Sequence, residues 1–422
     1  MEKHGLIIGI DYTNEYCQAC YYDSRHKRVE SITTGGAVMR YLIPTVLCYD
    51  KKNEGFLTGE TAMLYAEQEG CDLIGNLLDG MLIGEQYEAG GRIYTYAELF
   101  ARYIADLLDM VKIRSGQMNI ENVTMTLRYI DPGVKAAVEN ALLILKIGPD
   151  RVRLVSCDES FAYYVLEREP QLKSTLLFDF GSEGFFSRQL APSNVKESLI
   201  YYVKERDHSA DFSVKDVANA KLRLDLDNKL TEIYEEVMPP GVGNSVYFTG
   251  EGFSEMWFEG TLRQISRKHK VFKGNDIYVK GACIAGYIRS HKEGRDFPIM
   301  CDDRTKAQIS ICASYRGKTR EIELSGAAQN WYDAGAVCDF ILDDDKAARL
   351  VITSLASGER VLEDFDLSSF PERPPGTTRI EARVQYISST ECEVTFTDKG
   401  FGAFFEGSGM QVKKKFDFGE YI

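Results

Sequence analysis

The sequence lacks the features that mark several large classes of protein. It has only five histidines, and its ten cysteines include one Cys-x-x-Cys pair, Cys17 and Cys20, with no second pair to complete a zinc site. No apolar run is long enough to span a membrane, and too few apolar residues precede Asp11 for a signal peptide. We therefore expect a cytoplasmic protein that does not contact membranes and whose cysteines are reduced and packed.

Positive charge is also scarce. The 422 residues include 50 Lys and Arg against 64 Asp and Glu, which gives a net charge of −14 at pH 7. The basic runs Arg267–Lys270 and Lys413–Lys415 are short. A protein that follows a nucleic-acid backbone needs an excess of positive charge, so nucleic acid is not an expected partner. The apolar fraction of 44% is typical of a folded globular chain, and the length suggests two or three domains.

Strands and helices alternate through residues 1–295. Leu6–Ile10 is a continuous apolar run, as expected for a strand buried on both faces. Ser174–Phe186 repeats the pattern of an apolar strand, an aspartate at its end, a polar turn and a second apolar stretch. Thr95–Glu98 and Asp131–Pro132 are typical starts of helices. The repeated pattern predicts a duplicated α/β architecture with a cleft between two lobes.

Short strands separated by turns dominate residues 300–422. Six strands are expected, and they are Gln308–Tyr315, Arg320–Leu324, Ala336–Leu342, Arg349–Ala356, Thr378–Ile387 and Glu391–Thr397. No helix-length periodic run interrupts them in the sequence. The pattern predicts a separate all-β domain, a small sandwich.

Three turns at strand ends carry residues that suit a nucleotide. Asp11 and Asp179, one from each lobe, could hold a hydrated magnesium ion through water. Gly250 and Gly252 could allow a close backbone approach to the adenosine, because glycine lacks a Cβ. Each motif alone is common turn chemistry. Their order and context together indicate a nucleotide site.

These motifs resemble those of the actin-fold ATPases, and specifically of the 70-kDa heat-shock chaperones of the DnaK type. Gly9–Asn14 is similar to the first phosphate loop of that family, Phe178–Gly184 to the second, and Phe248–Phe253 to the adenosine loop. Further segments follow the spacing of the chaperones' β-sandwich peptide-binding domain, and they are Ser357–Arg360, Phe365–Pro371, Pro374–Gly376, Arg379–Glu381 and Asp398–Gly400. The resemblance covers nearly the whole chain.

The resemblance implies an actin-like nucleotide-binding domain over residues 1–295 and a β-sandwich over residues 300–422. It implies a site for ATP or ADP with magnesium, whose residues are Asp11, Thr13, Asn14, Asp179, Gly181, Ser182, Gly250 and Gly252. The implied catalytic carboxylates are Asp179 and Asp158, with Glu159 as the alternative to Asp158. An extended apolar peptide or client protein is the implied partner, bound in a groove of the strands between about Gln308 and Leu355.

Several residues depart from the family pattern. Thr13 stands where the family has a glycine, and Ser182 and Glu183 replace two glycines of the second loop. At an effective dielectric constant of about 20, a negative charge about 4 Å from a phosphate oxygen costs about 4 kcal/mol. Met63 stands where the family has the lysine that positions the γ-phosphate.

The chain is also shorter than the family in two places. Little more than one predicted helix, Val214–Met238, lies between the second phosphate loop and the adenosine loop, so the adenine-clasping subdomain is expected to be reduced. No helical lid is expected after the sandwich.

Two hypotheses follow. The first is a chaperone-like protein that binds ATP and magnesium, hydrolyses ATP slowly or not at all, and binds peptide segments through its β domain. The second is a non-enzymatic scaffold or interaction protein whose ATPase cleft is degenerate. Sugar and acetate kinases that share the fold are disfavoured, because none of their motifs is visible.

Overall fold

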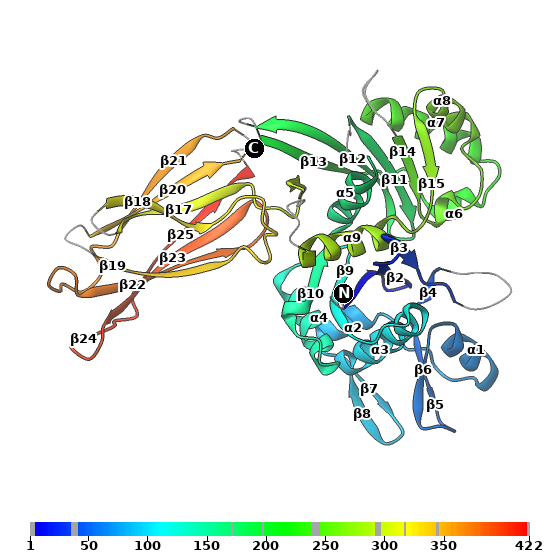
Figure 1. Ribbon diagram of the computed structural model, residues 1–422, viewed down its shortest axis with the longest axis horizontal. Helices are drawn as coiled ribbons and strands as arrows, with labels where there is room; N and C mark the ends of the chain where they lie inside the picture. Colours follow the sequence, from blue (N-terminus) through cyan, green and yellow to red (C-terminus); the bar gives the residue numbers. More distant parts are fainter. Residues whose placement is uncertain are drawn as a thin grey trace. The chain divides into compact units, whose positions relative to one another are not determined.

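The computed structural model describes residues 5–34, 41–169, 173–195, 198–238, 245–291, 297–315, 318–342, 346–355 and 357–419. It divides into two compact units. The first contains Met1–Asn194 and Ser198–Ile299, and the second contains Met300–Ile422 with Val195–Glu197. The first unit mixes helices and strands, whereas the described elements of the second are all strands (Figure 1). This division lies close to the border that the sequence predicts.

Two sheets of the first unit share one strand order. The first sheet consists of β1 (Leu6–Tyr12), β2 (Tyr16–Asp23), β3 (Arg28–Ser31), β4 (Ile43–Pro44), β9 (Ile120–Thr126) and β10 (Val152–Val155). The second consists of β11 (Thr175–Gly181), β12 (Gly184–Val195), β13 (Ser198–Asp207), β14 (Ser245–Thr249), β15 (Lys270–Lys273) and β16 (Ile299–Met300).

The order is β3-β2-β1-β9-β10 in the first sheet and β13-β12-β11-β14-β15 in the second. In each, an antiparallel hairpin is followed by parallel strands on the side of its first strand. The two halves therefore repeat one arrangement, while the assignment to the actin-like fold stays a prediction.

Helices and two small hairpins complete the described part of the first unit. The helices are α1 (Gly59–Glu69), α2 (Leu77–Ile83), α3 (Tyr96–Ser115), α4 (Pro132–Ile144), α5 (Cys157–Arg168), α6 (Val214–Val217), α7 (Arg223–Val237), α8 (Glu259–Ser266) and α9 (Ile277–His291), with 3₁₀ turns η1 (Pro149–Arg151) and η2 (Glu251–Phe253). The hairpins are β5 (Leu47–Asp50) with β6 (Gly55–Thr58), and β7 (Gln86–Ala89) with β8 (Arg92–Thr95). None of the helices in these described ranges is long and apolar enough to cross a membrane.

Local capping chemistry fixes the helix starts that the sequence predicts. The Thr95 hydroxyl accepts a hydrogen bond from the Glu98 N–H, and the Glu98 carboxylate accepts one from the Thr95 N–H, which closes the capping box of α3. The Asp131 carboxylate accepts from the Val134 N–H at 2.7 Å and caps α4. Both predicted helix starts are confirmed, because each depends only on neighbouring residues.

The single helix predicted over Val214–Met238 is wrong. The structure has two helices there, α6 and α7, separated by a turn. The Asn219 side chain accepts a hydrogen bond from the Lys221 N–H at 3.2 Å inside this turn. Asparagine side chains compete with the helical hydrogen-bond ladder in this way, and the local turn interrupts the helix.

Helix α9 packs closely against the first sheet and α5. At Gly281 a Cβ would lie 1.9 Å from the backbone oxygen of Ser160 in α5, so only glycine permits this contact. The Thr126 hydroxyl lies 2.6 Å from the Ser160 hydroxyl and donates to the backbone oxygen of Tyr278 at 3.3 Å. These contacts fix the first turn of α9, and with it the position of Tyr278.

The second unit contains two antiparallel sheets around one apolar core. One has the order β18-β17-β20-β21, and the other β19-β22-β23-β24 with β25 also paired to β23. The strands are β17 (Ala307–Tyr315), β18 (Lys318–Ser325), β19 (Ala336–Leu342), β20 (Ala347–Ser354), β21 (Arg360–Asp366), β22 (Thr378–Tyr386), β23 (Glu391–Phe401), β24 (Phe405–Glu406) and β25 (Gln411–Asp417). All six predicted strands are present, and β21, β24 and β25 were missed.

A buried ion pair ties the residue just before the Pro374–Gly376 segment to the Asp398–Gly400 segment. Arg373 donates to both carboxylate oxygens of Asp398, at 2.6 and 2.8 Å. The two side chains are only 6% and 0% exposed. Asp398 also accepts from the backbone N–H groups of Gly400 and Ser408. The pair therefore connects the chain before β22 to β23.

Candidate functional site

A cavity of about 380 Å³ lies in the first unit where the loops of its two sheets meet. We call it the first cavity. Its lining includes the β1–β2 turn, the β11–β12 turn and the start of η2. Pockets of this size commonly bind small molecules. Of the residues predicted to bind nucleotide, it is lined by Asp11, Thr13, Asp179, Gly181, Ser182 and Gly250.

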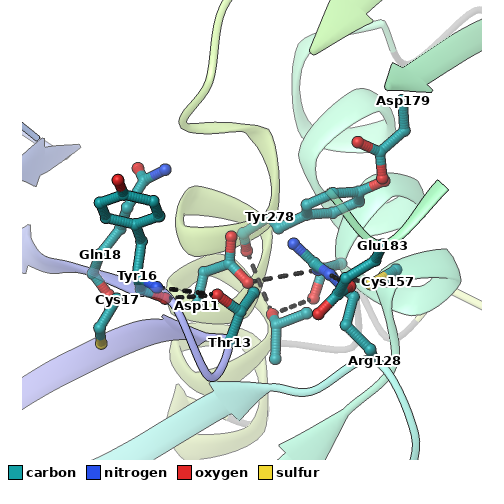
Figure 2. Close-up of polar contacts among 12 residues, drawn as sticks. Asp11, Thr13, Tyr16, Cys17, Gln18, Arg128, Cys157, Asp179, Glu183 and Tyr278 are labelled. Carbon is teal, nitrogen blue, oxygen red and sulfur yellow. Dashed lines mark hydrogen bonds and ion pairs between the residues drawn. The ribbon is translucent and has the colours of Figure 1, made fainter. Parts of the chain in front are cut away.

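Arg128, just after β9, reaches across this cavity from the first sheet to the second. Its Nε donates to Glu183 in the β11–β12 turn at 2.9 Å, and its Nη1 lies 3.4 Å from Asp11 Oδ1. The guanidinium also lies over the Tyr278 ring, 4.8 Å from the centroid. Figure 2 shows Arg128 between Asp11 and Glu183, beside Cys157. A cation of the protein itself thus occupies the space beside the predicted magnesium carboxylate of the first sheet.

Arg188 of β12 has the same role on the second sheet. Its Nη1 donates to Asp179 Oδ2 at 3.1 Å and to the Tyr278 hydroxyl at 2.9 Å. Its Nε donates to Asp158 at 2.9 Å, and its Nη2 pairs with Glu205. The Tyr278 hydroxyl in turn donates to Asp179 Oδ2 at 2.6 Å. Both carboxylates predicted to be catalytic, Asp158 and Asp179, are therefore bound to one buried arginine.

Burial and the two arginines oppose each other in setting the protonation of this cluster. Burial raises the pKa of Asp11, and the nearby Arg128 lowers it. The pKa of Glu183 is also raised, by its removal from water, again with Arg128 acting in the opposite direction. Burial raises the pKa of the Cys157 thiol to about 12, so the thiol stays protonated.

The charges around the two arginines do not balance. Five carboxylates surround the two guanidinium groups, and they are Asp11, Asp158, Asp179, Glu183 and Glu205. With all of them ionised, five negative charges against two positive ones leave three in excess. Such a cluster repels a polyanion, because like charges interact strongly where water is partly excluded.

The polar residues of the first loop make contacts within the protein. The Thr13 hydroxyl accepts from the Tyr16 N–H at 3.0 Å and donates to the Tyr16 backbone oxygen at 2.8 Å, which closes the β1–β2 turn. The Asn14 amide donates to Asp79 of α2 at 2.7 Å. Ser182, across the cavity, donates to Glu15 at 2.8 Å. Thr13 therefore has a turn-forming role that the glycine of the family could not fill.

The glycines of the predicted adenosine loop lie against Phe180 of β11. A Cβ at Gly250 would lie 2.2 Å from the Phe180 backbone oxygen, and Gly250 has a φ of +96°. At Gly252 a Cβ would lie 2.3 Å from the Phe180 ring. No atom lies within 4 Å of a Cβ built at Gly181, by contrast. Packing within the protein is thus sufficient to explain Gly250 and Gly252, whereas Gly181 has open space.

Two further residues that the family resemblance singled out, Met63 and Glu159, do not face the first cavity. Met63, in place of the family's lysine, is exposed on α1 and lines a second, larger cavity. Glu159, the alternative to Asp158, closes the capping box at the start of α5 with Ser156. Neither residue is placed to act on a γ-phosphate in the first cavity.

The predicted magnesium ligands do not suit a hydrated metal ion as they are arranged. Asp11 Oδ1 and Asp179 Oδ2 face guanidinium N–H groups, and Asp179 Oδ2 also accepts from Tyr278. Magnesium needs oxygen ligands in octahedral geometry and keeps several waters. Among the residues that the structure describes, no group of three or more His, Cys, Asp or Glu side chains is arranged to hold a metal ion.

Four residues of this cluster could not be identified as site residues from the sequence alone, and they are Arg128, Arg188, Glu205 and Tyr278. Arg188 had a weak signal, since it follows Phe185 and Phe186 closely in the sequence, and a buried arginine needs a partner. Arg128 carried no such signal, because it follows the end of β9 where an arginine is ordinary. Its partners Glu183 and Asp11 are 55 and 117 residues away in the sequence.

The Cys-x-x-Cys pair lies in the core. Cys17 and Cys20 of β2 are fully buried, and burial raises the pKa of both thiols. Cys20 donates to the Val279 backbone oxygen of α9, while Cys17 faces Tyr103 of α3. They point to opposite faces of the strand, as residues three apart in a strand do. All ten cysteines of the chain are free thiols.

Two sequence-family models match the chain, one over each of its two parts. Residues 28–302, more than half of the chain, match the sequence model for the C-terminal part of a family of unknown function, DUF5716. The chain belongs to this family. The DUF5716 match contains Arg128, Arg188 and Tyr278, and it begins after β2, so it excludes Asp11. A second match, to the domain of unknown function DUF8552, covers residues 304–418. No curated protein matches the chain.

Proposed function

We propose that this DUF5716 chain is a non-enzymatic interaction protein on an actin-like scaffold, which binds extended protein segments without a nucleotide cycle. The observation that carries the proposal is the arginine pair. Arg128 and Arg188 interact with Asp11 and Asp179, the two carboxylates that a magnesium–nucleotide complex would need. A triphosphate entering the first cavity would have to displace these contacts and approach five carboxylates.

A titration with ATP and magnesium tests the claim that the protein works without a nucleotide. Ligand that binds only the folded state raises its stability, by about 2.7 kcal/mol at a concentration of 100 times Kd. We expect no heat by calorimetry and no rise in melting temperature at millimolar ATP with magnesium. A saturable heat with a rise in melting temperature would contradict the proposal.

The edge strand β19 is the surface that best suits an extended partner. It is the last strand of its sheet in the described part of the chain, so one side of its backbone is free to pair. Val337 and Ile341 point outward from it and are each 55% exposed. Their apolar side chains favour an apolar segment added as a further strand. Within the predicted groove, the sandwich core instead takes up apolar residues of β17 and β20 that include Ile309, Ile311, Leu350 and Ile352.

Fluorescence anisotropy with a labelled apolar heptapeptide tests this part. We expect weak binding that Val337→Lys and Ile341→Lys each reduce by about tenfold, which is the effect of 1.4 kcal/mol. Leu362→Lys is the matched control, since Leu362 is an exposed residue of β21, the edge of the other sheet. No change in anisotropy at high protein concentration would contradict the proposal.

The second candidate function is chaperone-like binding of ATP or ADP with magnesium, with weak or no hydrolysis. The first cavity favours it, because its volume suits a small molecule and Gly181 leaves open space at the second loop. The same ATP titration decides between the two candidates.

A further inference from the structure

Two cysteine thiols of the first unit lie in contact. The Sγ atoms of Cys48 in β5 and Cys71 after α1 are 3.0 Å apart. The S–S bond of a disulfide is about 2.05 Å long, so the two sulfur atoms need to approach by only about 1 Å to bond. Leu47 and Ile74 exchange two backbone hydrogen bonds of 2.8 Å, which hold the two chain segments side by side. The pair is therefore already placed for bond formation.

The two thiols differ in their access to solvent. Cys48 is fully buried, and burial raises its pKa to about 12. Cys71 is half-buried and lines the second cavity, an open cavity of about 980 Å³. A small molecule in this cavity can reach Cys71 first. In thiol–disulfide exchange the more accessible thiol then attacks first, and the protected thiol beside it can resolve the mixed disulfide.

We propose that Cys48 and Cys71 form a dithiol site whose substrate is a small disulfide such as glutathione disulfide. The Cys71 thiolate attacks one sulfur of the small disulfide, so its S–S bond breaks and one small thiol leaves. Cys48 then loses its proton and attacks Cys71 Sγ in the mixed disulfide, which releases the second small thiol. The protein dithiol is oxidised by two electrons, and the small disulfide is reduced to two thiols that take up the two protons.

The new bond would tie one wall of the second cavity to β5. The loop closed between Cys48 and Cys71 contains β6 and α1, and α1 supplies Glu60, Met63, Leu64, Ala66 and Glu67 to the cavity lining. A crosslink of this kind restricts the unfolded chain and holds α1 in place. The site is independent of the arginine cluster, because it shares no residue with it.

Mass spectrometry of the full chain after incubation with glutathione disulfide tests the proposal. We expect the intact mass to fall by two hydrogens, a non-reducing digest to show a Cys48–Cys71 crosslink, and dithiothreitol to reverse it. Cys48→Ser should stop the reaction at one glutathione on Cys71, while Cys71→Ser should leave Cys48 unmodified because it is buried. Cys312→Ser, which changes a half-buried cysteine of the second unit, should react like the original chain.

Alkylation of the unsubstituted chain gives a readout that does not depend on the variants. Under native conditions iodoacetamide should label Cys71 before Cys48, and prior incubation with glutathione disulfide should protect both. A stable glutathione adduct on Cys71 of the unsubstituted chain, a crosslink between other cysteines in place of Cys48–Cys71, or no reaction at all would overturn the proposal.

Discussion

Arg128 and Glu183 connect the two sheets of the first unit through a hydrogen bond of 2.9 Å between Nε and Oε2. Arg128 follows β9 of the first sheet, and Glu183 lies in the β11–β12 turn of the second sheet. Glu183, which a phosphate would encounter as a repulsive charge, thus has a partner supplied by the protein. The same guanidinium lies beside Asp11, so one side chain neutralises charge on both sides of the first cavity.

Arg128→Met should destabilise the first unit by about 3 kcal/mol, because it leaves the buried Asp11 carboxylate without its cation. The chain has only two tryptophans, and Trp257 lies in the core of the first unit. Urea unfolding followed by fluorescence in a Trp331→Phe background therefore reports this unit. Arg263→Met is the control, since Arg263 pairs with Glu259 on the exposed surface of α8, and its effect should stay below about 0.5 kcal/mol. Equal effects of the two changes would contradict the prediction.

The cost of Arg128→Met should grow as the pH rises. Burial raises the pKa of Asp11, and Arg128 opposes that rise, so the variant should have a still higher Asp11 pKa. A carboxyl whose pKa is raised in the folded state favours folding at low pH, and this contribution is lost as pH rises through the folded pKa. The difference in unfolding free energy between the two proteins should be larger at about pH 8 than at about pH 5. An Asp11→Asn change added to the variant should remove the part of this pH dependence that comes from Asp11 and leave the part that comes from Glu183, whose pKa Arg128 also lowers.

Substitutions of the loop glycines should separate packing from ligand binding. Gly250→Ala and Gly252→Ala should each destabilise the first unit by more than about 1 kcal/mol, because the added Cβ meets Phe180 and no small shift relieves it. Gly181→Ala should change stability by less than about 0.5 kcal/mol, because its surroundings are open. If nucleotide binds after all, Gly181→Ala should weaken that binding without loss of stability. Urea unfolding with the Trp257 signal measures the first effect, and calorimetry with ATP the second.

Much of the fold could be predicted because it depends on local signals. Capping side chains lie within three residues of the helix ends that they fix, and buried strands are continuous apolar runs. The strands β21 and β25 were missed because charged residues dilute their alternation, such as Asp364 in β21 and Lys413 in β25. The break between α6 and α7 was missed because a helical pattern of apolar residues continues across the Asn219 turn.

The site was predicted only in part, for a different reason. Asp11 and Asp179 do line one cavity, since the repeated strand-and-aspartate pattern places them at equivalent strand ends. Their arginine partners could not be found in the same way. Asp179 pairs with Arg188, 9 residues away on the neighbouring strand, but Arg128 reaches Asp11 across 117 residues. Such a pairing depends on how the sheets are assembled, and no local pattern records it.

Asp398→Asn should destabilise the second unit by about 3 to 5 kcal/mol, because it leaves the buried Arg373 without a counter-charge. Asp364→Asn is the matched control, since Asp364 pairs with Arg349 in the open and its effect should be much smaller. Trp331 packs against the core of the second unit, so a Trp257→Phe background isolates its signal.

The same pair predicts how the second unit responds to acid. The pKa of Asp398 is lowered by Arg373 and by hydrogen bonds from Ser408. A carboxyl with a lowered folded pKa contributes stability above its unfolded pKa of about 3.9, and this contribution is lost as pH falls toward the folded value. The urea midpoint of the second unit, followed through Trp331, should therefore fall steeply below about pH 4. The Asp398→Asn protein should start from a lower midpoint and show a shallower fall. Parallel acid curves for the two proteins would show that the Arg373–Asp398 pair contributes no pH-dependent stability.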